Sequence, residues 1–275
     1  MTSLRSRILH STLQWVIGAL VTHLSLQAQR TGIDELAHRL IHLSEGVTAD
    51  IVPADGVRAE WIEPAGIGPQ KVFLYLHGGG QRLCSIDTHR GLAARLALAC
   101  RSRVLIIAYC LAPDNPFPAA LEDALSAYHW LIQQGISPRP IPIAGDSAGG
   151  GLTFYTTVKL RDLGEHLSAT FFLLSPWADL TFSGESIRTR KGVDPIFGHD
   201  DDTLEITPVY LRAENDEIPL DHSTRLEKKL NAAGVYAQLD AWKDMWSVFQ
   251  VFAPFAPESQ LAIDEIGIFF CRQIH

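Results

Sequence analysis

Cysteine is scarce in this chain of 275 residues, and the four that it has are scattered. They are Cys84, Cys100, Cys110 and Cys271, and no two of them have the C-x-x-C spacing that is typical of zinc sites and thiol–disulfide catalysts. The pattern predicts free thiols in a reducing compartment, without a disulfide framework and without a metal. On this basis we expect a cytoplasmic protein.

Positive charge is also in short supply. The chain has 23 Lys and Arg against 31 Asp and Glu, which gives a formal net charge of −8 at pH 7. Binding to phosphate backbones or anionic lipids needs clustered basic residues that release counterions, and no such cluster occurs here. The balance therefore disfavours a nucleic acid or a membrane surface as partner.

A long uninterrupted apolar run is missing too. The best candidate, residues 8–26, follows two arginines and has the outline of a signal peptide. However, polar residues interrupt it at His10, Gln14 and His23, and its apolar residues recur at helical spacing. The segment therefore predicts an amphipathic helix that is too polar to span a bilayer.

Internal repeats and low-complexity tracts are absent, and from residue 71 onward short apolar runs alternate with helical patterns. This alternation predicts an α/β fold with a mostly parallel sheet covered by helices on both faces. Ahead of it, residues 1–45 predict two amphipathic cap helices, the second over 33–43, so that residues 46–275 form the core. The expected strands are 48–64 (a pair turning at 54–56), 72–76, 104–108, 141–144, 169–174, 207–212 and 236–242, and the expected core helices are 88–100, 121–134, 148–163 and 223–233.

The first chemical motif is Gly145-Asp146-Ser147-Ala148-Gly149-Gly150, which directly follows an apolar strand. G-x-S-x-G in this context is typical of a nucleophile elbow, a sharp strand-to-helix turn that exposes a serine hydroxyl. Glycine on either side of the serine tolerates the strained turn, and the helix that follows directs its N–H groups toward the serine oxygen. The motif predicts Ser147 as the nucleophile of an acyl-transfer reaction.

The second motif, His77-Gly78-Gly79-Gly80, follows the apolar strand 72–76. Three consecutive glycines let the backbone approach a ligand closely and direct N–H groups at a developing oxyanion. We expect the N–H groups of Gly78, Gly79 and Ala148 to form the oxyanion hole, where one donor is typically worth about 3 kcal/mol in the transition state. His77 is expected to be a structural hydrogen-bonding residue and not the base.

Four further stretches accompany these two motifs along most of the chain. They are residues 85–90 (SIDTHR), 109–114 (YCLAPD), 116–123 (PFPAALED) and 174–181 (LSPWADLT). Together with the glycine motifs, they resemble the bacterial hormone-sensitive-lipase branch of the α/β-hydrolase fold, which contains carboxylesterases and lipases. The resemblance implies an eight-stranded, mostly parallel sheet, a reduced helical cap, and a Ser, Asp or Glu, and His triad in that chain order. It also implies that no metal or organic cofactor is needed, and a homodimer formed through the final strand and helix would fit it.

The acid of the triad is expected in the acidic segment before the helix that starts at Ser223. Matched to the resembling family, the register puts Glu217 at the acid position, and a slip of one residue would favour Asp216 instead. A carboxylate there would orient an imidazole and stabilise its cationic form. The alternative interpretation is a solvated acidic loop that caps the following helix.

The base is where the sequence departs from the resembling family. In residues 242–248 (WKDMWSV), Ser247 stands where the family has histidine. A serine hydroxyl does not exchange a proton near neutral pH as imidazole does. The other late histidines are His222, an alternative base that precedes the expected last strand, and His275 at the chain end.

Two functions therefore remain open. The chain is either a carboxylic ester hydrolase that acts on short acyl esters with impaired turnover, or a hydrolase fold that binds a small ligand or runs a non-hydrolytic reaction in the oxyanion pocket. The second interpretation rests on Ser247, on Gln81, which replaces an aromatic residue of the resembling family, and on a connection between residues 195 and 208 that is shorter than in that family, where it contributes a helix to the cap. Cys110, which replaces an arginine of the family, is a further departure.

Overall fold

The computed structural model describes residues 2–69, 71–135, 141–165, 170–177, 220–232 and 236–274. Within these ranges, the side chains of residues 15–23, 220–222 and 273–274 are outside the description. All statements below concern the described residues.

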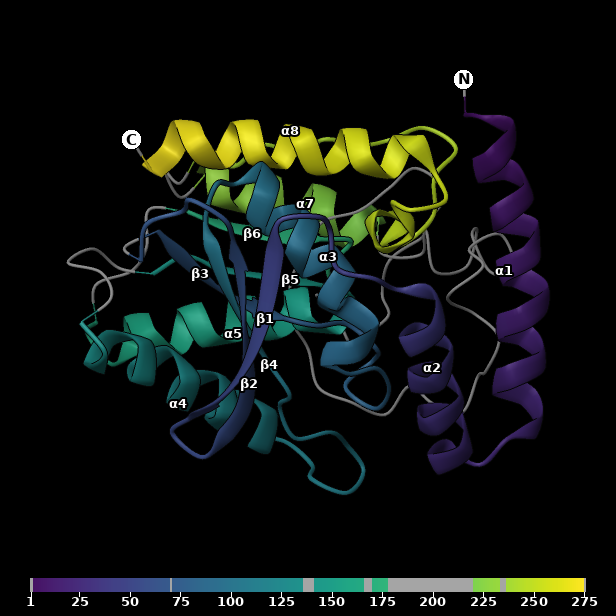
Figure 1. The fold of residues 1–275 in the computed structure, drawn as a ribbon. Coiled ribbons are helices and arrows are strands. Elements are labelled where there is room, and N and C mark those ends of the chain that lie inside the picture. Colours follow the sequence, from purple (N-terminus) through teal and green to yellow (C-terminus); the bar gives the residue numbers. More distant parts are fainter. Residues whose placement is uncertain are drawn as a thin grey trace.

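The centre of the molecule is a mixed sheet of six strands in the order β1-β2-β4-β3-β5-β6 (Figure 1). Strands β2, β4, β3, β5 and β6 follow one another across it, with β3 parallel to both β4 and β5, and β5 parallel to β6. The antiparallel pairs are β1 with β2 and β2 with β4. The strand bounds are β1 (Val47–Ala54), β2 (Val57–Pro64), β3 (Val72–Leu76), β4 (Arg103–Ile107), β5 (Ile143–Asp146) and β6 (Phe171–Leu174).

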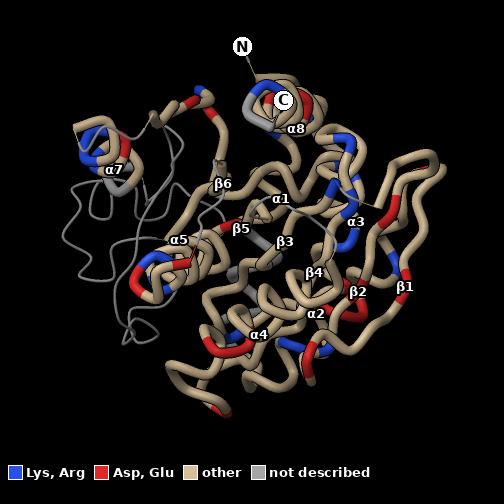
Figure 2. Tube along the Cα trace, turned by 90° about the vertical axis from the view of Figure 1, so that its left-hand side faces the viewer, with Lys and Arg blue, Asp and Glu red and all other residues tan. Residues whose placement is uncertain are grey.

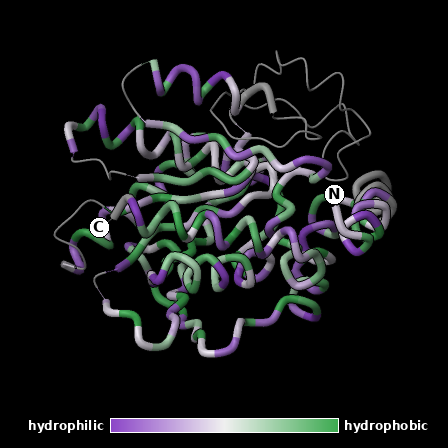
Figure 3. The backbone as a smooth tube through the Cα atoms, turned by 90° about the horizontal axis from the view of Figure 1, so that it is seen from above, coloured by the Kyte–Doolittle hydropathy of each residue, from purple (hydrophilic) through white to green (hydrophobic). Residues whose placement is uncertain are grey.

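Helices cover both faces of this sheet, as the continuous apolar strands predict. In β3, Leu74 packs on one face with α4 (Ala119–Gln133) and α5 (Ser147–Asp162), whereas Phe73 packs on the other face with α3 (Ile86–Ala99) and α8 (Pro257–Ile274). Both side chains are fully buried, because successive residues of a strand point to opposite faces and each face is covered. Figure 3 shows hydrophobic residues gathered in this middle part of the molecule.

The N-terminal helices α1 (Leu4–His23) and α2 (Leu26–Leu40) stand side by side at one side of the sheet (Figure 1). Helix α2 begins at Leu26 and not at the expected residue 33, because Ser25 caps it by accepting a hydrogen bond from the N–H of Ala28. At the start of α1, Ser6 Oγ donates to Glu258 Oε2 of α8 at 2.6 Å. No helix in the described part of the chain is long and apolar enough to cross a membrane.

The described residues contain six strands and not the eight that the resemblance implies. One expected strand, residues 207–212, lies outside the described residues. The other expectation, a strand over residues 236–242, is wrong, because this segment, which follows α7 (Leu220–Ala232), does not pair with any strand of the sheet. Its backbone is bound by side chains of α7 instead: the Ala237 N–H donates to Asn231 Oδ1 and the Leu239 N–H to Glu227 Oε1.

Acidic and basic residues are interspersed on the outer elements α3, β1 and β2 (Figure 2). The remaining short element, η1 (Phe249–Phe252), follows residues 245–248 and packs with them against α1 and α8. Because the parallel strands β3 and β5 end side by side, the two segments that follow them, the glycine-rich loop and the start of α5, meet at one edge of the sheet.

Candidate active site

The elbow is formed where β5 ends at Asp146 and α5 starts at Ser147. Ser147 is 4% exposed and has a φ of 48°, a left-handed conformation that costs energy for a residue with a side chain. The flanking glycines are required by close packing. A Cβ on Gly145 would lie 2.4 Å from the carbonyl oxygen of Gly149, and one on Gly149 would lie 2.1 Å from the carbonyl oxygen of Leu76. The elbow is thus pressed directly against the end of β3, which only glycine at these positions permits.

The glycine-rich loop follows β3 and lies on this elbow. Gly79 and Gly80 have φ values of 111° and 62°, and a Cβ on Gly79 would lie 2.2 Å from the carbonyl oxygen of Leu83. At Gly78 a Cβ would lie 2.2 Å from Asp146 Oδ2 and 3.1 Å from Ser147 Cβ. The fold therefore brings the two glycine motifs, which are far apart in the sequence, into direct contact.

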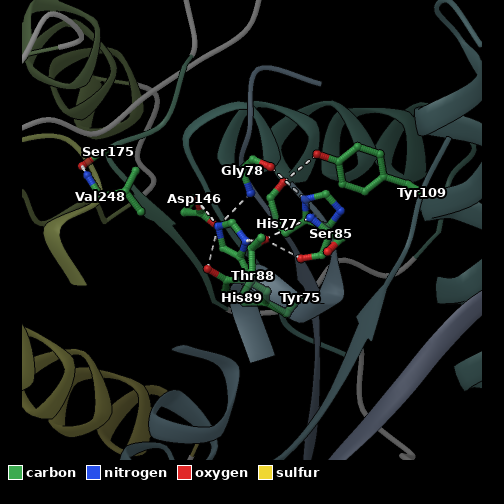
Figure 4. A network of polar contacts seen from close by, with 10 residues as sticks. All are labelled: Tyr75, His77, Gly78, Ser85, Thr88, His89, Tyr109, Asp146, Ser175 and Val248. Atoms are coloured by element: carbon green, nitrogen blue, oxygen red, sulfur yellow. Dashed lines mark hydrogen bonds and ion pairs between the residues drawn. The ribbon is translucent and has the colours of Figure 1, made fainter. Parts of the chain in front are cut away.

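Asp146 joins the two motifs through a buried network of hydrogen bonds (Figure 4). Its Oδ1 accepts from the hydroxyl of Tyr75 at 2.7 Å and from the N–H of Gly78 at 3.0 Å. Its Oδ2 lies 3.1 Å from Nε2 of His89, which must carry a hydrogen and donate, since an ionised carboxylate only accepts. Asp146 is 1% exposed, so these three donors replace the water that its charge would otherwise bind.

The network keeps the carboxylate of Asp146 ionised. Burial raises its pKa, but the charge and hydrogen bond of His89 and the hydrogen bond of Tyr75 outweigh this effect, and the pKa is lowered overall. Burial, followed by the charge of Asp146, raises the pKa of Tyr75 well above its usual value, so that its hydroxyl stays a donor. Asp146 is therefore an anchor for the loop, not an acid or base that titrates near neutral pH.

This network corrects one part of the predicted oxyanion hole. The N–H of Gly78 points at Asp146 Oδ1, so Gly78 is an anchor and its assignment as an oxyanion donor is wrong. Among the described residues, no acceptor is bonded to the N–H of Gly79 or Gly80. Ala148 is the second residue of α5, and its N–H has no partner within the helix. Within the described residues the N–H groups of Gly79, Gly80 and Ala148 are thus without an acceptor, and an oxyanion role for Gly79 and Ala148 stays a prediction.

His77 is a buried hydrogen-bonding residue, as the sequence predicts. It is 1% exposed, its ring is stacked on Tyr109 with centroids 4.4 Å apart, and Nδ1 lies 2.7 Å from the carbonyl oxygen of Gly78. Burial, followed by the nearby His89, lowers the pKa of His77 to about 4. The ring is therefore neutral near pH 7, with its hydrogen on Nδ1 because a carbonyl oxygen can only accept. The hydroxyl of Tyr109 in turn donates to the carbonyl oxygen of His77 at 2.6 Å.

The segment that contains Ser247 is tied to the elbow through the residues after β6. The N–H of Trp177 donates to the carbonyl oxygen of Ser147 at 2.8 Å. The N–H of Val248 donates to Ser175 Oγ at 2.9 Å, as Figure 4 shows. Ser247 itself is fully buried, and Val248 has a φ of 52°. Residues 175–177 are therefore hydrogen-bonded both to the backbone of Ser147 and to the turn that contains Ser247.

The other predicted site residues are not placed. Glu217, Asp216 and His275 lie outside the described residues, and His222 lies in the first turn of α7 with its side chain outside the description. Within the described ranges, no side chain is hydrogen-bonded to Ser147 Oγ, and no group of three His, Cys, Asp or Glu side chains is arranged to hold a metal ion.

Sequence reasoning missed His89, although a signal for it was available. Ile86, His89 and Ala93 recur at helical spacing and all three are buried, so His89 occupies a core-facing position of α3. A histidine on a buried helix face needs a hydrogen-bond partner, and the nearest acidic residue of the elbow supplies it. The contact between them could not be read from the sequence, since 57 positions separate the two residues.

Comparison with known proteins places the chain among esterases. A family model described as alpha/beta hydrolase fold matches residues 73–216. An acetyl-hydrolase of Streptomyces hygroscopicus is 35% identical over 245 residues, which cover 80% of this chain and 81% of that protein. An esterase of Acinetobacter venetianus is 30% identical over 275 residues, which cover 90% of this chain and 89% of that protein. The crystal structure of an esterase from the bacterial hormone-sensitive lipase family is similar with a TM-score of 0.87 and 34% identity, over 96% of this chain and 98% of that one.

Proposed function

This chain belongs to the alpha/beta hydrolase fold family, and we propose that it is a carboxylic ester hydrolase that acts on short acyl esters with Ser147 as nucleophile. The observation that carries the proposal is the contact between the glycine-rich loop and the elbow, which leaves unpaired N–H groups beside a strained, buried serine. The names of the relatives, acetyl-hydrolase and esterase, support the same reaction class.

In the proposed reaction, Ser147 Oγ attacks the acyl carbon while the carbonyl electrons move onto oxygen. The N–H groups of Gly79, Gly80 and Ala148 stabilise this oxyanion, and the N-terminus of α5 adds a favourable dipole. Collapse of the tetrahedral intermediate expels the alcohol and leaves an acyl ester on Ser147. Attack by water on this ester then releases the carboxylic acid and restores the serine.

The proton of Ser147 needs an acceptor, and this is the weak part of the site. We propose Glu217, or Asp216 in the slipped register, as the acid of the triad. Ser247 occupies the position of the histidine that would accept the proton and that this acid would orient. Without a base the serine is a poor nucleophile at neutral pH, and oxyanion binding alone would leave a rate on the order of 10³ to 10⁴ over water. His222 stays the alternative base.

The experiment that tests this proposal measures p-nitrophenyl butyrate hydrolysis by four proteins. These are the natural chain, Ser147→Ala, Ser247→His and the double variant. An intact site that lacks only a base predicts that Ser247→His raises kcat by about 100-fold or more, the size of a typical general-base contribution. The double variant is the matched control, because it has the new imidazole without the nucleophile, and it must lose the gain. Equal rates with and without Ser147 in both backgrounds would exclude the proposal.

A second function is favoured by the complete burial of Ser247. Ser247 is fully buried, so the position where the resembling family has histidine is closed to solvent. The alternative is therefore a hydrolase fold that binds a small ligand or runs a non-hydrolytic reaction at the oxyanion groups. Its signature in the same experiment is a folded Ser247→His protein with no gain in ester turnover.

A further inference from the structure

One guanidinium joins the N-terminal helix α2 to the residues that follow the glycine-rich loop. Arg30 Nε donates to the carbonyl oxygen of Arg82 at 2.7 Å, and Nη2 donates to the carbonyl oxygen of Ala112 at 2.8 Å. Nη1 donates to Asp114 Oδ2 at 2.6 Å. The side chain of Arg30 is only 17% exposed. A single planar side chain thus holds two backbone segments that meet beside the site.

These segments are also bonded to each other and to the loop. The N–H of Ala112 donates to the carbonyl oxygen of Gln81 at 2.8 Å. The N–H groups of Arg82 and Leu83 donate to the carbonyl oxygen of Gly79 at 3.1 and 2.8 Å. The orientation of the Gly79–Gly80 peptide therefore depends on where residues 81–83 are held, and Arg30 holds them from outside the loop.

The later part of the loop needs this support, because His77 Nδ1 and Asp146 hold only its first residue, Gly78. Ordering the backbone of one residue costs about 1–2 kcal/mol, and glycine loses more freedom than any other residue. Gly78 is fixed at one end by Asp146, whereas Gly79 and Gly80 have positive φ values and no side chains to pack. The end of the loop beyond Gly80 is where an external contact has the largest effect on the N–H directions.

A second contact from the same face of α2 supports the other side of the network. Asp34 lies four residues after Arg30, one helical turn on, and its Oδ1 accepts from Ser85 Oγ at 2.6 Å. Ser85 is the N-cap of α3, the helix that carries His89 and so holds Asp146. Helix α2 therefore contacts both structures that orient the glycine-rich loop.

We propose that Arg30 is a positioning residue for the oxyanion site: by its bonds to the carbonyl oxygens of Arg82 and Ala112 it fixes the direction of the Gly80 N–H group, which shares a peptide plane with the Gly79 carbonyl that residues 82 and 83 bind. The catalytic part of this inference rests on the proposed ester hydrolysis, and the structural part does not. Lysine cannot replace Arg30, because one ammonium cannot bond three acceptors in the fork that the guanidinium spans.

The test compares Arg30→Ala and Arg30→Lys with two controls. Arg39→Ala removes an arginine of the same helix whose side chain is 77% exposed and pairs only loosely, at 3.9 Å, with Glu35. Asp114→Asn removes the exposed ion-pair partner of Arg30 but leaves both backbone acceptors in place. All variants are made in the natural chain and in the Ser247→His background.

Two measurements separate the ordering of the loop by Arg30 from the reaction. Hydrogen–deuterium exchange measured by mass spectrometry over residues 78–84 reports how well the loop is ordered and needs no turnover. We expect faster exchange in the two Arg30 variants and in neither control. In the active background, we expect Arg30→Ala to lower kcat by about 10- to 100-fold with KM within about twofold, since misdirected donors weaken transition-state binding.

Unchanged exchange in Arg30→Ala overturns the proposal, and so does a loss that Arg39→Ala shares equally. An unchanged kcat in a folded Arg30→Ala protein also overturns it. If no background shows turnover that depends on Ser147, the proposed function fails, and the exchange measurement still decides whether Arg30 orders the loop. If Arg30→Ala does not fold, Arg30→Lys carries the comparison.

Discussion

Replacing Gly78 by alanine is expected to destabilise the protein severely, because the added methyl group has nowhere to go. The new Cβ would lie 2.2 Å from Asp146 Oδ2 and 3.1 Å from Ser147 Cβ. An exposed carboxylate could turn away from such a contact at little cost. Asp146 cannot, because it is 1% exposed and held by hydrogen bonds from Tyr75, Gly78 and His89.

The magnitude follows from the two ways in which the contact can be relieved. Forcing an extra methyl group into a packed interior costs about 1–3 kcal/mol. If Asp146 moves, a buried hydrogen bond to a charged group is lost as well, which costs about 1.5–3 kcal/mol. The sum, about 2.5–6 kcal/mol, is a large part of the total stability of a typical domain, about 5–15 kcal/mol.

The assay is urea unfolding followed by circular dichroism, with Gly32→Ala as the matched control. Gly32 lies within α2, where a Cβ would meet nothing within 4 Å, so alanine there should stabilise the protein by about 0.5–1 kcal/mol through helix propensity. The two glycine-to-alanine changes thus have opposite expected signs. A Gly78→Ala protein whose unfolding free energy stays within about 0.5 kcal/mol of the natural chain would refute the reasoning, given the overpacking costs cited above.

Two further predictions concern the same network. The pKa of His77 is lowered to about 4 in the fold, so between pH 6.5 and 4 the unfolded chain binds a proton that the folded chain does not, and stability must fall as the pH falls. Between pH 8 and pH 5 this residue should cost about 2 kcal/mol, and His77→Asn, which keeps an N–H donor without a titrating ring, should remove that part of the slope in urea unfolding at the two pH values. Tyr75→Phe removes one donor from buried Asp146 and should lower the unfolding free energy by about 1.5–3 kcal/mol at pH 7, whereas at a pH below the lowered pKa of Asp146 the difference should shrink; a difference independent of pH would contradict a role for the carboxylate charge.

The arrangement of the core could be predicted from the sequence to a large extent. Val72–Leu76 is apolar at every position, which predicts a strand buried on both faces, and the structure confirms it in β3. The turn at Asp55-Gly56 between β1 and β2 is equally clear from the sequence, because Asp-Gly is a preferred pair for a tight hairpin. The structure confirms it, with φ values of 52° and 86° at these residues. The expected strand over residues 236–242 failed because an apolar pattern does not tell whether a neighbouring strand or the side chains of α7 will bind its backbone.

The site was predicted less evenly. The motifs predict the contact between the elbow and the glycine-rich loop, which the structure confirms. The roles of Ser147 as nucleophile and of Ser247 at the histidine position stay predictions from the sequence. The direction of an individual N–H group, however, is not a property of the motif. Gly78 and Gly79 are the same residue type at adjacent positions. Yet the N–H of Gly78 is bonded to Asp146, whereas in the described residues the N–H of Gly79 has no acceptor.

By itself the sequence determined the elements that depend on local chemistry: the strand and helix periodicity, the strained turn at Ser147, and the glycines that let two backbones touch. It determined these because periodicity and the absence of a Cβ act over a few residues. Only the tertiary structure decided which groups around Ser147 are hydrogen-bonded to other segments and which are not. Asp146, His89 and Arg30 each form hydrogen bonds with residues that are distant in the sequence. The sequence alone does not show which distant residues will lie within hydrogen-bonding distance of one another.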